Sequence, residues 1–386
     1  MQITGDWLTN KATQSVCHLL EEDGHLALFV GGCVRNTLLD APVSDIDIAT
    51  DARPETVIEL ARVKGLKTVP TGIEHGTVTI IARGIPHEVT TFRHDVETDG
   101  RRATIAFADD VADDARRRDF TMNALYADAR GKVIDPLGTG LPDLAARKVR
   151  FIENAGERIR EDYLRTLRFF RFHAWYGDAA GGLDAEGLAA IAENLDGLSR
   201  LSAERVGSEM LKLMAAPDPA PSVAAMRHAG VLARLLPGAD DKALGPLVHI
   251  EQENGIAPDG LRRLAALGGD DVARRLRLSK KQARALAAFA EEIGTATTAD
   301  ALGYHYGLEI ARDICLLRAA LLEQPFPPDA LIQAQRGAEA RFPLKAADLP
   351  DLKGPEIGRR LKALEARWIA SGFRLSRDEL LATPDG

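Results

Sequence analysis

The stretch GGCVRNTLLDAPVSDIDIAT, from Gly31 to Thr50, places two glycines and an arginine ahead of two aspartates that flank one isoleucine. The alternation of polar and apolar residues near its end predicts a strand, with Asp45 and Asp47 projecting from one face. Two neighbouring carboxylates raise each other's pKa unless a cation neutralises them. This pattern therefore predicts a site for a hard divalent ion such as Mg²⁺, which prefers oxygen ligands.

The two glycines add a second chemical signal to the same stretch. Gly31 and Gly32 follow an apolar run, HLALFV, that predicts a buried strand, and they precede a short predicted helix. Glycines at such a junction let backbone N–H groups approach phosphate oxygens, and Arg35 could add a bidentate phosphate contact. The pattern is neither a G-x-G-x-x-G fingerprint nor a P-loop. A double glycine alone is usually only a turn, and D-x-D is frequent on exposed strands, so the combination carries the prediction.

Local patterns predict a mixed first part and a helical remainder. In the first 150 residues we expect a helix from Pro54 to Gly65, a β-hairpin over 77–93 that turns near Gly84, a long charged loop over 94–118, and a helix over 119–128 with Asp119 near its N-cap. From Phe151 onward the periodicity is helical, with helices expected over 156–177, 202–216 and 279–293. The expected fold is α+β at the N-terminus with a mixed β-sheet, followed by an all-α part.

Composition limits the function classes. The chain has 386 residues, which suggests two or three domains, and a net charge of −8, which argues against nonspecific coating of nucleic acid but leaves room for a local basic surface. No apolar run reaches the roughly 18 to 20 residues that span a bilayer, and the N-terminus does not resemble a signal peptide. The three cysteines lie far apart and form no metal-binding pair, so we expect a reducing, cytoplasmic location.

The quoted stretch resembles the first signature of the class II CCA-adding tRNA nucleotidyltransferases and bacterial poly(A) polymerases, which belong to the DNA polymerase beta-like nucleotidyltransferase superfamily. Further similar segments follow in the family's order: RRRDFTMNALYAD, DPLGTGLPDL, REDYLRTLRFFRF, SAERVGSEMLKLM and KGPEIGRRLKALEARWIASG. The resemblance implies a catalytic head over 1–150, a neck with a nucleotide-base template over 151–216, a body over 217–320, and a tRNA-binding tail over 321–386.

The resemblance also implies roles for individual residues. Asp45 and Asp47 would be catalytic and bind the metal ions, with Glu88 as candidate third carboxylate, although an exposed strand glutamate is nearly as good an interpretation. The implied nucleotide-binding residues are Gly31, Gly32, Arg35, Arg118, Asp119, Asp162, Arg165, Arg168 and Arg171. One position departs from the family's G-G-x-V-R-D, because this chain has Asn36 in place of the aspartate. That change is tolerable if the aspartate only braces the turn.

Two pairs of these residues have competing interpretations. Arg118 and Asp119 would recognise the ribose 2′-hydroxyl, which both donates and accepts, or they would simply form a basic helix start with an acidic cap. Asp162 and Arg165, three apart on one predicted helix face, would form either a surface ion pair or a base template. As a template, the carboxylate would accept from the amino group of cytosine or adenine and the arginine would donate to the ring nitrogen.

The expected reaction is addition of C, C and A to the 3′ end of tRNA from CTP and ATP, with Mg²⁺ as cofactor and pyrophosphate as the product. The segment 94–106 resembles the flexible region that is associated in the family with the switch from C to A, which favours full CCA addition. The alternatives are a poly(A) polymerase, a CC-only or A-only enzyme, an inactive RNA-binding protein, and a drug-modifying nucleotidyltransferase. We expect tRNA as the partner, no obligatory protein partner and no membrane contact.

Overall fold

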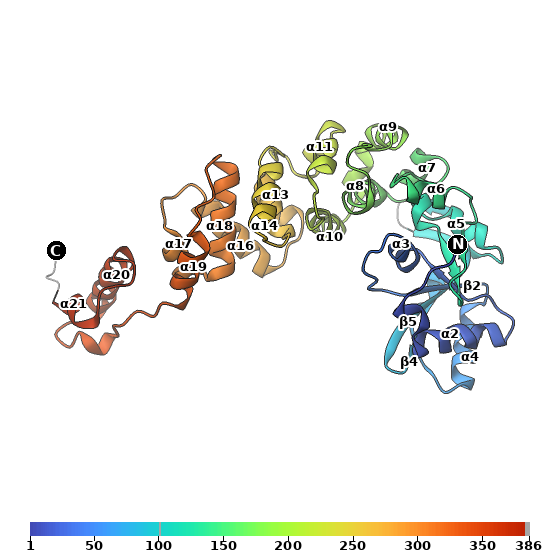
Figure 1. The fold of residues 1–386 in the computed structure, drawn as a ribbon, viewed down its shortest axis with the longest axis horizontal. Coiled ribbons are helices and arrows are strands. Elements are labelled where there is room, and N and C mark those ends of the chain that lie inside the picture. Colours follow the sequence, from blue (N-terminus) through green and yellow to red (C-terminus); the bar gives the residue numbers. More distant parts are fainter. Residues whose placement is uncertain (100–101, 383–386) are drawn as a thin grey trace. The chain divides into compact units, whose positions relative to one another are not determined.

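The computed structural model describes residues 1–99 and 102–382, which form two compact units, Met1–Pro237 and Gly238–Gly386. The first unit contains the sheet and the helices that follow it, and the second contains the C-terminal helices (Figure 1). Each unit has its own core, so the two are described separately. None of the helices in the described ranges is long and apolar enough to cross a membrane.

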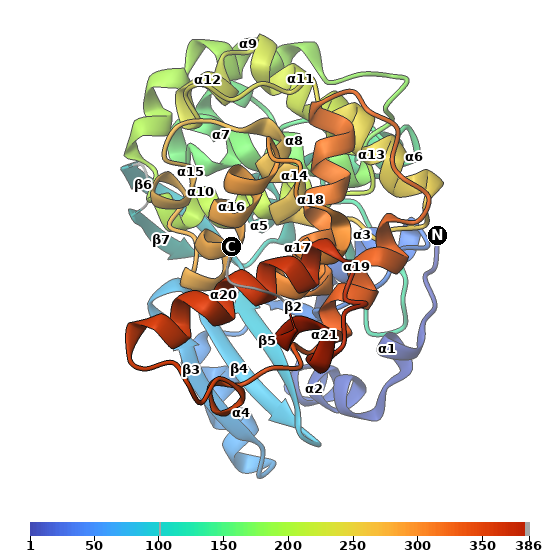
Figure 2. The same cartoon turned by 90° about the vertical axis from the view of Figure 1, so that its left-hand side faces the viewer.

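A seven-stranded mixed sheet organises the first unit, and its strand order is β3-β4-β5-β2-β1-β8-β9. The strands are β1 (Leu28–Val30), β2 (Asp47–Thr50), β3 (Lys67–Gly72), β4 (Thr77–Ala82), β5 (Ile85–Thr91), β8 (Tyr126–Asp128) and β9 (Val133–Ile134). Only β2 and β5 pair in parallel, and all other neighbours are antiparallel. The expected mixed sheet is confirmed, and β3, β4 and β5 lie side by side in Figure 2.

The helix α4 and the hairpin after it form where the sequence predicts them. Helix α4 (Pro54–Val63) has proline in its first turn and packs with α2 (Lys11–Glu22) on the sheet. Strands β4 and β5 are joined by Arg83 and Gly84, whose φ values of 50° and 81° are typical of a two-residue hairpin turn. The remaining short elements near the sheet are α1 (Asp6–Thr9), α3 (Gly32–Leu38), η1 (Ile73–His75) and α6 (Gly140–Ala145).

The charged stretch over 94–118 is not the long loop that we expected. It contains a two-stranded hairpin, β6 (Arg93–Asp99) and β7 (Arg102–Phe107), followed by α5 (Val111–Arg116), which is capped by Asp110. Gly100 and Arg101, on which part of that prediction falls, lie outside the described residues. The hairpin does not join the seven-stranded sheet. Its strands therefore do not need one apolar face for the core of that sheet, and the alternation of apolar and polar residues that would have predicted them is missing.

The segment over 119–128 is also not the predicted helix. A single 3₁₀ turn, η2 (Thr121–Asn123), leads directly into β8, whose Tyr126 and Ala127 are fully buried beside β1. Asp119 therefore caps no α-helix. Sheet burial overrides the local helical pattern, because strand pairing with β1 fixes the direction of the chain.

The single helix predicted over 156–177 is two helices, α7 (Ala155–Glu161) and α8 (Leu164–Tyr176). Asp162 lies between them in extended backbone, with φ −152° and ψ 105°, and its Oδ1 accepts a hydrogen bond of 3.1 Å from the Leu164 backbone N–H. Asp162 and Arg165 thus do not share a helix face. The unit continues with α9 (Ala185–Glu193), η3 (Leu195–Arg200), α10 (Ala203–Met214), α11 (Ala220–His228) and α12 (Val231–Leu235).

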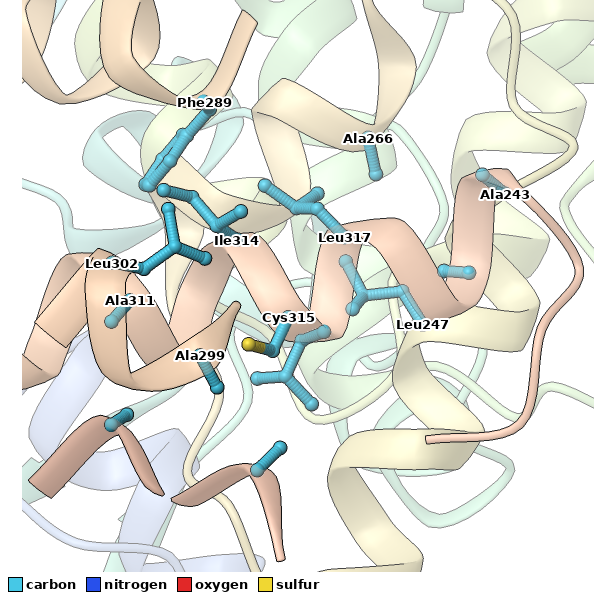
Figure 3. Close-up of a cluster of buried hydrophobic side chains, with 14 residues drawn as sticks. Ala243, Leu247, Ala266, Phe289, Ala299, Leu302, Ala311, Ile314, Cys315 and Leu317 are labelled. Atoms are coloured by element: carbon cyan, nitrogen blue, oxygen red, sulfur yellow. The ribbon is translucent and has the colours of Figure 1, made fainter. Parts of the chain in front are cut away.

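The second unit is helical throughout its described residues, as expected. It contains α13 (Leu244–Glu253), α14 (Gly260–Leu267), α15 (Val272–Arg275), α16 (Lys280–Glu292), α17 (Ala299–Tyr306), α18 (Leu308–Leu321), α19 (Ala330–Glu339), η4 (Ala346–Asp348), α20 (Pro355–Ala370) and α21 (Arg377–Leu381). Its core is built around α18, whose Ile314 and Leu317 pack with Leu247 and Phe289 (Figure 3). The predicted α16 starts after a capping box made by Ser279 and Gln282.

Candidate active site

The turn between β1 and α3 brings backbone close to several polar side chains. Gly31 has a φ of +68°, which L side chains rarely adopt, and its N–H donates to the Leu125 carbonyl. A Cβ atom at Gly31 would lie 3.5 Å from Nη1 of Arg118 and 3.4 Å from Oδ1 of Asn123, whereas one at Gly32 would meet nothing within 4 Å. Glycine is therefore required at the first position, and the second leaves open space at the start of α3.

Two of the predicted carboxylates are direct neighbours across the sheet. Asp47 is the first residue of β2, and its register partner on the parallel strand β5 is Glu88. Burial and the Glu88 carboxylate raise the pKa of Asp47, with a further contribution from Asp45, whereas Arg118 lowers it. Asp47 is therefore exposed to the negative charges of Glu88 and Asp45 and to the positive charge of Arg118.

Asp45 does not belong to the strand in which we expected it. It precedes β2 on an exposed segment, and its Oδ2 accepts a hydrogen bond of 2.9 Å from Ser44. Within the described residues, no three acidic, histidine or cysteine side chains are arranged closely enough to enclose a metal ion. The donor set fits Mg²⁺ all the same, because this ion binds through one or two carboxylates and takes its other ligands from substrate phosphates and water.

Arg118 is held by two buried partners that sequence reasoning missed. Asp114 accepts from Nη2 at 3.0 Å and from Nε at 3.3 Å, and the Tyr126 hydroxyl accepts from Nε at 3.0 Å and donates to Asp114 at 2.7 Å. Burial alone would raise the pKa of Asp114, but Arg118 and Arg117 hold it well below its usual range. Nη1 of Arg118 makes no hydrogen bond to the described residues, so it is the nitrogen left to face the Gly31 turn.

We expect Asp114→Asn to raise the KM for nucleotide about tenfold, which corresponds to about 1.4 kcal/mol, because Arg118 loses the charge that orients it. Steady-state kinetics with CTP would measure this change. Asp143→Asn is the control, since Asp143 is also a buried carboxylate and accepts from Arg150 and Thr121. An equal rise in KM in the control would show that general loosening of the unit, and not Arg118, is responsible.

A second cluster joins Asp119 to α8. Buried Asp119 accepts from the Phe120 N–H at 2.9 Å, from Nδ2 of Asn123 at 3.0 Å and from Nε of Arg168 at 2.6 Å. Burial alone would raise the pKa of Asp119, but Arg168 and the Asn123 amide lower it to about 2. Asp119 and Arg118 are therefore not paired with each other, and each residue has its own partners.

Arg35 is directed into the protein. Its Nη1 donates to Oδ1 of Asn123 at 2.7 Å and its Nη2 donates to the Tyr176 hydroxyl at 2.9 Å, while the guanidinium lies 4.1 Å from the centre of the Tyr176 ring. Asn36 accepts two further bonds from the same guanidinium. Arg35 is buried, so its side chain connects Asn123 with the end of α8 and does not project into open space.

The residues expected to form the base template are likewise engaged. Asp162 makes a bidentate ion pair with Arg205 of α10, with distances of 2.6 Å and 3.2 Å. Arg165 donates to Glu161 at 2.5 Å and to the carbonyls of Arg158 and Arg117. The alternative of an Asp162–Arg165 surface ion pair is therefore wrong.

The last arginine of the predicted set, Arg171, also has an acidic partner. Its Nε donates at 2.6 Å to Glu209, a largely buried residue of α10. Helix α10 thus supplies partners for two residues of the predicted set, Glu209 for Arg171 and Arg205 for Asp162. Both Arg205 and Glu209 lie in SAERVGSEM, and their pairing with Asp162 and Arg171 could not be read from spacing, because the partners are far apart in the sequence.

The chain can be compared with known proteins on this basis. The pattern of the poly(A) polymerase head domain matches residues 27–150, and that of the probable RNA and SrmB-binding site of polymerase A matches residues 183–242. The mitochondrial CCA tRNA nucleotidyltransferase 1 of Mus musculus is 32% identical over 97% of this chain and 90% of its own length. This chain is a CCA tRNA nucleotidyltransferase family member.

Other members of the CCA tRNA nucleotidyltransferase family show the same relationship. The CCA-adding enzyme of Geobacillus kaustophilus is 39% identical over 57% of this chain and 52% of its own length. The crystal structure of the Bacillus stearothermophilus CCA-adding enzyme in complex with CTP has a TM-score of 0.73 and 28% identity, and the alignment covers 94% of this chain and 93% of that one. The expected nucleotidyltransferase head with a helical remainder is thus confirmed.

Proposed function

We propose that this protein adds C, C and A to the 3′ end of tRNA, using CTP and ATP and releasing pyrophosphate. Its family supports this reaction over nearly the whole chain. The observation that carries the proposal is the in-register pairing of Asp47 with Glu88 beside Arg118 and the Gly31 turn. Such a site combines carboxylates for cations with donors for phosphate, which is the chemistry that phosphoryl transfer requires.

Asp45, Asp47 and Glu88 are the residues that would hold Mg²⁺. When bound, the ion would neutralise charge on the triphosphate and lower the pKa of the attacking 3′-hydroxyl. The raised pKa of Asp47 supports the assignment, because no ion pair to this carboxylate is found among the described residues and only the charge of Arg118 offsets the carboxylates around it. Glu88 is exposed on its strand, so it remains able to turn toward a ligand.

Several residues of the chain then position the nucleotide. Gly31 and Gly32 admit the phosphates, and the unoccupied Nη1 of Arg118 donates to the nucleotide. Asp119 and Arg168 would contact the ribose, whose hydroxyl would donate a hydrogen bond to the buried carboxylate. Arg35 would hold Asn123 in position, and Arg171 would hold α8 against α10 through its pairing with Glu209.

Asp162 and Arg165 would select the base from the edge of α8. Oδ2 of Asp162 accepts one bond from Arg205, which leaves it able to accept from an amino group of cytosine or adenine. Nε of Arg165 has no bond to the described residues and can donate to the adjacent ring nitrogen. Uracil and guanine present the opposite order of donors and acceptors, so each would leave polar groups mispaired.

For the whole chain we keep the division into head 1–150, neck 151–216, body 217–320 and tail 321–386 as a proposal, with tRNA bound along the helical part. The boundary between the two compact units, after Pro237, falls within the proposed body.

A reducing cytoplasmic location agrees with three buried cysteines that form no disulfide.

A stepwise extension assay tests the proposed function. A tRNA transcript that ends before CCA should gain two residues with CTP alone and one more when ATP is added. Long adenosine tracts on RNA other than tRNA would instead identify a poly(A) polymerase. Products that stop after CC, or a single A added only to a CC-ending transcript, would identify the CC-only or A-only enzymes, and no product at all would leave an inactive RNA-binding protein.

A further inference from the structure

A continuous chain of hydrogen bonds links the segment that carries Asp45 to the nucleotide-binding helix α8. Its members, in order, are the Pro42 carbonyl, Asn36, Arg35, Asn123, Asp119 and Arg168. Each bond is between 2.6 and 3.2 Å long. The chain begins three residues before Asp45 and ends at the arginine of α8 that we assign to the nucleotide.

Asn36, which stands where the G-G-x-V-R-D pattern quoted above has an aspartate, is the link that both donates and accepts. Its Oδ1 accepts from Nε and Nη2 of Arg35 at 3.2 and 2.9 Å, and its Nδ2 donates to the Pro42 carbonyl at 2.7 Å. A guanidinium can only donate and a carbonyl can only accept. The residue between them must therefore offer both an acceptor and a donor, which an amide does and an ionised aspartate does not.

The backbone around Pro42 depends on the same residue. The Asn36 carbonyl accepts from the Ala41 N–H at 2.8 Å, and Asp40 has a positive φ of 54°, so the chain reverses direction directly after α3. The side-chain bond to Pro42 fixes the next step of this reversal. Ser44 and Asp45, which follow, are exposed, so little packing holds them in place.

We propose that Asn36 is a positioning residue that fixes the Asp45 segment relative to the cluster of Asp119 and Arg168. The inference rests on the proposed function in one respect, namely that Asp45 takes part in catalysis. An aspartate at this position would keep the bond to Arg35 but would place a carboxylate oxygen against the Pro42 carbonyl. The segment would then lose its side-chain hydrogen bond at Pro42, while Arg35, Asp119 and Arg168 would keep their positions.

The experiment compares Asn36→Asp with wild type and with a matched control, Asn194→Asp. The Asn194 side chain also donates to a carbonyl, that of Ala190, at 2.7 Å, and it lies in the same unit but outside the site. We would measure kcat and KM for addition of C from CTP to tRNA. We would also measure hydrogen–deuterium exchange of the peptide that covers 40–46, with no substrate present.

In Asn36→Asp we expect kcat to fall about tenfold while the KM for CTP stays within about twofold. The reason is that Asp45 is displaced, whereas Asp119 and Arg168, which contact the nucleotide, are not. Exchange over 40–46 should become faster in this variant and remain unchanged in Asn194→Asp. Asn36→Gln keeps the amide and should recover part of kcat.

A wild-type kcat in Asn36→Asp, an equal fall in the control, or unchanged exchange over 40–46 would overturn the inference. If the wild-type protein adds no nucleotide, the proposed function fails. The exchange measurement then still decides whether Asn36 holds the segment, so the two failures are distinguishable.

Discussion

Asp47→Asn is expected to lower kcat for nucleotide addition by at least about a thousandfold, which places it among the largest effects in this protein. The substitution keeps the shape of the side chain and removes the charge that a cation requires. Asp45→Asn should have a similar effect, because the two carboxylates contribute to one electrostatic site. Transfer of labelled cytidine from CTP to tRNA, with circular dichroism as a check on folding, measures the loss.

Asp51→Asn provides the control for this prediction. Asp51 follows the end of β2 and accepts hydrogen bonds from the Leu26 N–H and from His25, away from Glu88. It carries the same change of charge only four residues from Asp47, and it should keep activity within about twofold of wild type. If Asp47→Asn retained more than about a tenth of the wild-type rate, the carboxylate would not be essential and the proposed metal site would be wrong.

Base choice should respond most strongly to Asp162→Ala. We expect the preference for CTP over UTP, measured as the ratio of kcat/KM values, to fall about a hundredfold. The carboxylate is the group that accepts from the cytosine amino group, and its removal also frees Arg205, which can then donate to the uracil carbonyl. Total activity should fall much less than in the metal-site variants.

Asp196→Ala is the matched control for the loss of an Asp–Arg pair. Asp196 pairs with Arg234 at 2.8 Å in the same unit, and neither residue belongs to the site. Its preference for CTP should be unchanged. An undiminished preference in Asp162→Ala would mean that this carboxylate holds α10 in place and does not read the base.

Local sequence patterns were sufficient for much of the fold because they coincide with packing. Strand β5 alternates buried and exposed residues, its partner β4 is mostly buried, and α4 is delimited by Pro54 and the glycine that follows the helix. The break at Asp162 escaped prediction because good helix-forming residues lie on both sides of it. At the break, Asp162 is extended, accepts a hydrogen bond from the Leu164 N–H and pairs with Arg205, a residue 43 positions away.

In the candidate site, too, some residues could be proposed from the sequence, whereas most of their hydrogen-bond partners could not. Asp47, Glu88 and Gly31 were proposed from the adjacent aspartates, the glycine pair and the family resemblance. The structure places Asp47 in register with Glu88 and gives Gly31 a positive φ, whereas Asp45 lies outside β2. The partners of the arginines were not identifiable in general, since they come from other elements. Asp114 and Glu161 are exceptions, because each precedes its arginine, Arg118 or Arg165, by four residues, and that spacing was an available signal.

The three native thiols have a practical consequence. Cys17, Cys33 and Cys315 are all buried, and burial raises the pKa of Cys17 to about 12 and that of Cys33 to about 11. Thiolate, the form that reacts with maleimides, is therefore scarce at neutral pH. A cysteine introduced on an exposed helix of each unit would accept a fluorescent dye selectively, so successive additions could be followed by energy transfer without removing any native sulfur atom.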